Sequence, residues 1–122
     1  RGRIPEMLRA IDEIAESHAI PMAAYGHAGD GNLHVNFLFA EARDQSAEHN
    51  LQAALRTLFE RTIALGGTLS GEHGIGVLKR DFMPIEHSRI SLDYQQRLKA
   101  MWDPDGRLNP GKVLPPAGTW SE

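Results

Sequence analysis

The strongest constraint on the fold is an alternating segment, Leu33–Phe39, which follows the glycine-rich stretch GHAGDGN. Successive side chains of a strand point to opposite faces, so this segment would have one apolar face and one polar face. The apolar set is Leu33, Val35, Phe37 and Phe39, and the polar set is His34 and Asn36. A second short apolar segment, Pro21–Tyr25, precedes the glycines, and we expect two strands joined by this loop.

Apolar residues recur at helical spacing on both sides of the two strands. The spacing predicts one amphipathic helix over Pro5–Ser17, with Pro5 in its first turn. It predicts a second helix between Asp44 and Leu65, which Gly66 and Gly67 would end.

Shorter elements are expected in the rest of the chain. They are a strand at Thr68–Ser70, a short helix at Val77–Met83 and a last helix that Ser91 caps and that runs to Trp102. A turn-rich, extended tail follows that helix.

The predicted order of helix, strand, strand, helix, strand and helix is an α+β arrangement. It is similar to a partial ferredoxin-like sandwich, in which helices cover an antiparallel sheet, with a C-terminal helix and the extended tail added. The first strand of such a sandwich would lie upstream of Arg1, and the chain starts without an initiator Met. We therefore interpret residues 1–122 as a single domain cut from a larger protein.

Composition excludes several classes of function. A chain of 122 residues is too short for a dinucleotide-binding domain together with a substrate domain, and its net charge of -3 gives no basic surface for nucleic acid. The absence of cysteine excludes disulfides and thiolate metal sites and suits a reducing compartment. No apolar run reaches the length of a transmembrane segment. We expect a cytoplasmic protein, or one peripheral to the inner face of a membrane.

Two imidazoles are expected near the glycine-rich loop. The glycines permit backbone angles that could fold His27 back toward His34, while Asp30 is expected to shape the turn and not to bind a metal. A half-buried strand with a solvated polar face is the competing interpretation of His34.

A second polar motif is GEHGIG, at residues 71–76. Neighbouring side chains diverge in extended backbone, so Glu72 and His73 would serve different partners, one a metal and the other a substrate. The motif by itself is also compatible with an exposed glycine-rich loop that has no function.

Taken together, His27, His34 and Glu72 form a set of two imidazoles and one carboxylate. Such a set binds divalent zinc, iron, manganese or cobalt and leaves positions open for water or substrate. The cation could hold the carboxylate and hydroxyl of a 2-hydroxy acid. His73 would then take the hydroxyl proton, a task that suits imidazole near neutral pH.

Three blocks, GHAGDGNLHVNF, LSGEHGIG and DPDGRLNPGKVL, together resemble the C-terminal domain of the FAD-linked oxidases related to vanillyl-alcohol oxidase. The group includes D-lactate dehydrogenases, D-2-hydroxyglutarate dehydrogenases and the flavin subunit of bacterial glycolate oxidase. The resemblance covers roughly Pro5 to Pro115.

The resemblance implies a role for each of six residues. His27, His34 and Glu72 would bind zinc or manganese, Asn36 would contact the substrate, His73 would be the catalytic base that also contacts the substrate, and Asn109 would lie near the flavin. It also implies that this flavoprotein binds FAD mainly through an N-terminal domain that this chain does not contain. The intact oxidoreductase would oxidise lactate, glycolate or 2-hydroxyglutarate, and the isolated chain would be inactive.

Two other interpretations remain at this point. The chain could be a stand-alone metal-dependent hydrolase or iron oxygenase built on the same three ligands. It could also be a binding or oligomerisation module without enzymatic activity. The sequence does not identify the 2-hydroxy acid or the electron acceptor, and it is compatible with a homo-oligomer.

Overall fold

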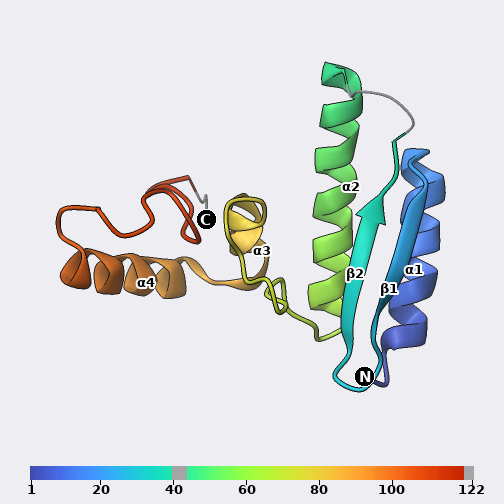
Figure 1. Cartoon of the computed structure of the whole chain (residues 1–122), viewed down its shortest axis with the longest axis horizontal. Coiled ribbons are helices and arrows are strands. Elements are labelled where there is room, and N and C mark those ends of the chain that lie inside the picture. The colour runs from blue at the N-terminus through green and yellow to red at the C-terminus, as the bar shows by residue number, and fades with distance from the viewer. Residues whose placement is uncertain (40–43, 120–122) are drawn as a thin grey trace. The chain divides into compact units, whose positions relative to one another are not determined.

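The structure, a computed structural model, describes residues 1–39 and 44–119. The chain divides into two compact units, Arg1–Gly67 and Thr68–Glu122. The first unit contains α1 (Ile4–His18), β1 (Met22–His27), β2 (Asn32–Phe37) and α2 (Gln45–Ala64), and the second contains the short 3-10 helix η1 (Arg80–Phe82), α3 (Met83–Glu86) and α4 (Arg89–Trp102) (Figure 1). The α+β class is therefore confirmed.

The register of the two strands separates their apolar and polar side chains. β1 and β2 pair antiparallel, with Ala24 opposite Val35 and Tyr25 opposite His34. Residues that face each other across an antiparallel pair lie on the same side of the sheet. One side therefore carries Met22, Ala24, Val35 and Phe37, and the other carries Ala23, Tyr25, His34 and Asn36. The predicted alternation of β2 is confirmed.

Both long helices of the first unit cover the apolar side of this sheet. Its core cluster consists of Ile11, Ile14, Ile20, Ala54 and Leu58, packed against Met22, Ala24, Val35, Phe37 and Phe39. The two predicted helices of this unit are confirmed, and their ends lie within one residue of the predicted ends. Asp44 caps α2 by accepting a hydrogen bond from the backbone N–H of Ala47 at 2.8 Å. The polar side of the sheet has no such cover from α1 or α2.

The predicted strand at Thr68–Ser70 does not form, because its backbone groups are bonded elsewhere. The N–H of Leu69 donates to the Glu86 carboxylate at 2.8 Å, and the carbonyl of Leu69 accepts from Lys79 Nζ at 2.7 Å. Leu69 itself is only 2% exposed. This segment is held by side chains and not by a neighbouring strand.

The later helices also differ from the prediction. Residues 77–79 form turns, and the helical segment begins at Arg80 and extends to Glu86, beyond the predicted end at Met83. The last helix is capped by Ser88 and not by Ser91: Ser88 Oγ accepts from the Ser91 N–H at 3.3 Å. The predicted end of this helix, at Trp102, is confirmed.

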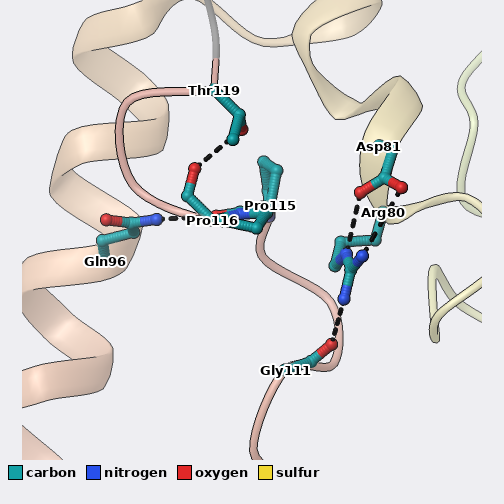
Figure 2. A network of polar contacts seen from close by, with 7 residues as sticks. All are labelled: Arg80, Asp81, Gln96, Gly111, Pro115, Pro116 and Thr119. Carbon is teal, nitrogen blue, oxygen red and sulfur yellow. Dashed lines mark hydrogen bonds and ion pairs between the residues drawn. The ribbon is translucent and has the colours of Figure 1, made fainter.

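The tail is turn-rich, as predicted, but it does not run straight. Gln96 of α4 donates to the carbonyl of Pro115 at 2.8 Å, and Arg80 donates to the carbonyl of Gly111 at 2.7 Å (Figure 2). Asp81 accepts hydrogen bonds from the same Arg80 guanidinium. Two side chains from separate helices therefore fix the path of the tail inside the second unit.

The turn that ends α4 is built on a buried carboxylate. Asp103 is 8% exposed and accepts hydrogen bonds from the backbone N–H groups of Arg107 and Leu108 at 2.8 and 2.9 Å. Lys99 also donates to this carboxylate. The hydrogen bond from Lys99, with those from the two backbone groups, lowers the pKa of Asp103 below its usual value.

Because the pKa of Asp103 is lowered by folding, its charge stabilises the fold above the pKa of an unfolded Asp, about 3.9. This stabilisation is lost as the pH falls through the lower pKa of the folded state. We predict that Asp103→Asn lowers the melting temperature of the intact protein at pH 7 and that the difference from the unsubstituted protein narrows below pH 4. Thermal unfolding at a series of pH values measures this, with the exposed Asp105→Asn as control. A difference that does not change with pH would contradict the role assigned to the charge.

Candidate metal and substrate site

The two candidate ligands of the first unit meet through the strand ladder. His27 is the last residue of β1 and pairs with Asn32, so it lies diagonally across from His34, two residues further along β2. Diagonal neighbours on one side of a sheet are within reach of long side chains. The imidazole centroids are 5.5 Å apart with the rings nearly perpendicular, and one nitrogen of each ring lies within 4.8 Å of the other.

The loop between the strands contributes less to this convergence than expected. Gly26 lies inside β1 and not in the loop, and the turn spans residues 28–31. Asp30 Oδ1 accepts a hydrogen bond from the Asn32 N–H at 3.1 Å, which bears out its expected role in shaping the turn. Gly31 has a φ of 85°, a conformation that favours glycine.

Asn36 shares the polar side of the sheet with His34 and contacts Tyr25, a residue that the sequence motifs alone do not indicate. Its Nδ2 donates to the hydroxyl of Tyr25 at 3.5 Å, and the ring of Tyr25 stacks on His34 with centroids 5.2 Å apart. Tyr25 and His27 are two positions apart in β1, so strand alternation was the signal that could have identified Tyr25.

Glu72 and His73 lie in a turn of the second unit and not in extended backbone. The Gly74 N–H bonds to the Gly71 carbonyl at 3.0 Å, which closes the turn. His73 Nε2 lies 3.4 Å from Glu72 Oε1, so the expected divergence of these two side chains is wrong. A carboxylate accepts at both of its oxygens, so this contact is compatible with Glu72 as a metal ligand.

The loop that carries Glu72 and His73 is fixed at both ends. At its start, Glu86 and Lys79 hold the backbone of Leu69, and at its end the carbonyl of Gly76 accepts from the Val113 N–H at 2.7 Å. Burial lowers the pKa of Lys79, whose ammonium group donates to the partly buried carbonyl of Leu69. The exposed tips of Glu72 and His73 therefore project from a loop with an anchored backbone.

Asn109, the expected neighbour of the flavin, lies in the tail of the second unit. Its φ is 50°, in the left-handed region that Asn tolerates better than most residues. Its carbonyl accepts from the Lys112 N–H at 3.3 Å, which closes the turn Asn109–Lys112. The side chain is exposed.

The candidate residues thus fall into two groups. His27, His34 and Asn36 belong to the first unit, and Glu72, His73 and Asn109 belong to the second.

The imidazole pair fits a divalent cation by its donor chemistry. Two nitrogens bound to one zinc ion at about 2.0–2.1 Å lie about 3.3 Å apart in a tetrahedron. The nitrogens of His27 and His34 are within 4.8 Å of each other, a separation that rotation of the two side chains can adjust. Manganese also accepts imidazole and carboxylate ligands, so the donor set does not select one of these metals.

The sequence of this chain matches one family over nearly its whole length. The model of the family described as FAD linked oxidases, C-terminal domain, matches residues 1–113. The chain belongs to this family.

Several curated relatives are similar to the chain. It is 38% identical to the glycolate oxidase subunit GlcD of Bacillus subtilis over 93% of its own length. It is 36% identical to the D-2-hydroxyglutarate dehydrogenase of Stutzerimonas stutzeri and 37% identical to the D-lactate dehydrogenase of Archaeoglobus fulgidus, again over 93% of the chain. These alignments cover 24%, 25% and 24% of the three relatives, so the chain spans about a quarter of their length.

Among the residues that the structure describes, none of the helices combines the length and the apolar character that a membrane crossing requires.

Two glycines near the histidine pair differ sharply in the space around them, which gives a matched pair of substitutions. A Cβ on Gly26 would lie 2.1 Å from the backbone oxygen of Asn32, whereas a Cβ on Gly29 would meet nothing within 4 Å. We predict that Gly26→Ala destabilises the intact protein by about 1–3 kcal/mol, a typical cost of overpacking, and loosens any metal held by His27 and His34. Gly29→Ala should change neither property.

Thermal unfolding and metal analysis of the purified variants measure both effects. Equal melting temperatures and equal metal contents in the two glycine variants would show that the close approach of the strands at Gly26 does not matter for the site.

Proposed function

We propose that this chain is the C-terminal part of an FAD-dependent dehydrogenase that oxidises a D-2-hydroxy acid to the corresponding 2-oxo acid. The observation that carries the proposal is the family match, together with three relatives whose names share one chemistry. Glycolate, D-lactate and D-2-hydroxyglutarate all carry a hydroxyl group next to a carboxylate. The reaction removes two electrons and two protons from the substrate, and FAD, held mainly by the rest of the protein, supplies the hydride acceptor.

The residues that would hold a divalent metal, zinc or manganese, are His27, His34 and Glu72. The support for the first two is their convergence on the polar side of the sheet, and the support for Glu72 is the resemblance noted in the sequence. When bound, such a metal supplies a positive charge that attracts the carboxylate and hydroxyl oxygens of the substrate and favours loss of the hydroxyl proton.

His73 is the residue that we assign as the base. Its Nε2 faces the Glu72 carboxylate, so we assign Nδ1 to accept the hydroxyl proton. The nearby carboxylate would stabilise the imidazolium that this transfer forms. Proton acceptance at His73 and hydride loss from the α-carbon together account for both protons and both electrons.

Asn36 and Asn109 have binding roles in this proposal. Asn36 lies on the same side of the sheet as His34, where its amide could hydrogen-bond a substrate oxygen. Asn109 would contact the flavin from the exposed turn of the tail. The absence of cysteine supports a reducing compartment such as the cytoplasm.

The two rival interpretations have less support. Neither interpretation explains why the chain matches FAD-linked oxidases: not a stand-alone metal hydrolase or iron oxygenase, and not a non-enzymatic binding module.

Anaerobic addition of D-2-hydroxy acids to the intact protein tests the proposal. We predict a bound-flavin spectrum that bleaches with at least one of D-lactate, glycolate and D-2-hydroxyglutarate. His34→Ala should lose metal and bleaching together, because it removes a ligand. His73→Ala should keep the metal and the flavin but bleach at least 100-fold more slowly, as expected for loss of a general base.

Exposed histidines away from the candidate site provide the control, and His49→Ala should bleach like the unsubstituted protein. A protein that contains metal but no flavin would refute the proposed reaction. Equal metal loss in His34→Ala and His73→Ala would show instead that His73 is a ligand.

A further inference from the structure

Tyr25 lies beside the candidate metal and substrate residues of the sheet, and it has no role in the proposed reaction. It is 60% exposed on the polar side of the sheet, although burial of an aromatic ring is energetically favourable. Strand register places it directly opposite His34, and its hydroxyl reaches Asn36. The exposed side chain of Tyr25 therefore contacts both a candidate metal ligand, His34, and a candidate substrate-binding residue, Asn36.

The ring of Tyr25 restrains His34 without using the atoms that bind metal. The two rings are stacked, with 5.2 Å between centroids and 27° between planes. A stacked neighbour contacts the face of an imidazole, whereas the ring nitrogens bind metal in the plane of the ring. The contact can therefore fix the orientation of the His34 ring while its nitrogens remain able to bind a metal.

The hydroxyl of Tyr25 restrains Asn36 in a similar way. Asn36 Nδ2 donates to Tyr25 Oη over 3.5 Å, a long hydrogen bond. With the amide nitrogen turned to Tyr25, the amide oxygen of Asn36 points away from the Tyr25 hydroxyl. The hydroxyl of Tyr25 also keeps its own hydrogen as a donor on this side of the sheet.

We propose that Tyr25 is a positioning residue of the candidate site, whose ring orients His34 for metal binding and whose hydroxyl orients Asn36 for substrate binding. This inference rests on the proposed function: its second half rests on the proposed reaction, and its first half rests on His34 as a metal ligand. The first half requires that His34 bind a metal and does not depend on the identity of the reaction.

The alternative is that Tyr25 acts only as a cross-strand partner that stabilises the sheet. Aromatic pairs across strands commonly contribute to stability in this way. If Tyr25 has a purely structural role, its variants should have lower melting temperatures. Loss of the ring would then not specifically weaken metal binding, and loss of the hydroxyl would not specifically weaken substrate binding.

Two substitutions of Tyr25 in the intact protein separate its ring from its hydroxyl. Tyr25→Phe keeps the stacked ring and removes the hydroxyl, and Tyr25→Ala removes both. Tyr94→Ala is the matched control, because Tyr94 is the other tyrosine of the chain and is similarly exposed, at 64%. For each protein, Zn²⁺ is titrated into the metal-free form against a chromophoric chelator, and the rate of flavin reduction is followed over a range of D-2-hydroxy acid concentrations.

The ring and the hydroxyl should give different results. We predict that Tyr25→Ala raises the dissociation constant for Zn²⁺ about 3- to 10-fold, in line with the strength of aromatic pairs, while Tyr25→Phe and Tyr94→Ala stay within about twofold of the unsubstituted protein. Both Tyr25 variants should raise the apparent dissociation constant of the substrate about 2- to 10-fold, in line with one hydrogen bond, with a limiting reduction rate close to that of the unsubstituted protein.

Zinc affinity that is unchanged in Tyr25→Ala, or lost equally in Tyr25→Phe, would overturn the role of the ring. Substrate affinity that is unchanged in Tyr25→Phe would overturn the role of the hydroxyl. If no hydroxy acid reduces the flavin of the unsubstituted protein, the proposed function fails, and the zinc titrations still decide the role of the ring.

Discussion

The antiparallel register of β1 and β2 is the constraint on which the histidine site depends. With Tyr25 opposite His34 and His27 opposite Asn32, the two imidazoles must lie on the same side of the sheet, and the apolar residues must lie on the side that α1 and α2 cover. A slip of one residue would exchange the two sides and place His34 against the core. The packing of the apolar side therefore fixes the geometry of the polar side.

The second unit holds its candidate site residues by different means. In one core cluster of this unit, Met83 and Leu92 are buried, and Ile75 and Leu114 pack against them. Its loops are held by side chains as well as by backbone hydrogen bonds: Glu86 and Lys79 hold Leu69, Asp103 holds the closing turn, and Arg80 and Gln96 hold the tail. The polar bonds position the loop with Glu72 and His73 where regular secondary structure is absent.

The parts of this architecture that follow local rules could be predicted from the sequence. Alternation identified the two faces of β2, and helical spacing identified α1 and α2. The rest depended on contacts that local patterns do not contain. Thr68–Ser70 has strand-like residues but bonds to side chains, Ser88 and not Ser91 precedes the first turn of α4, and the turn at Glu72 brings this residue toward His73. The pairing of Tyr25 with His34 required the register of both strands.

We propose above all that His27 and His34 bind one divalent metal ion on the polar side of the sheet. X-ray absorption at the edge of the metal in the purified intact protein tests this directly. We predict about one metal per chain with two imidazole ligands, at about 2.0–2.1 Å for zinc, and oxygen ligands in the remaining positions. An active protein without metal, or a bound metal without imidazole ligands, would contradict it.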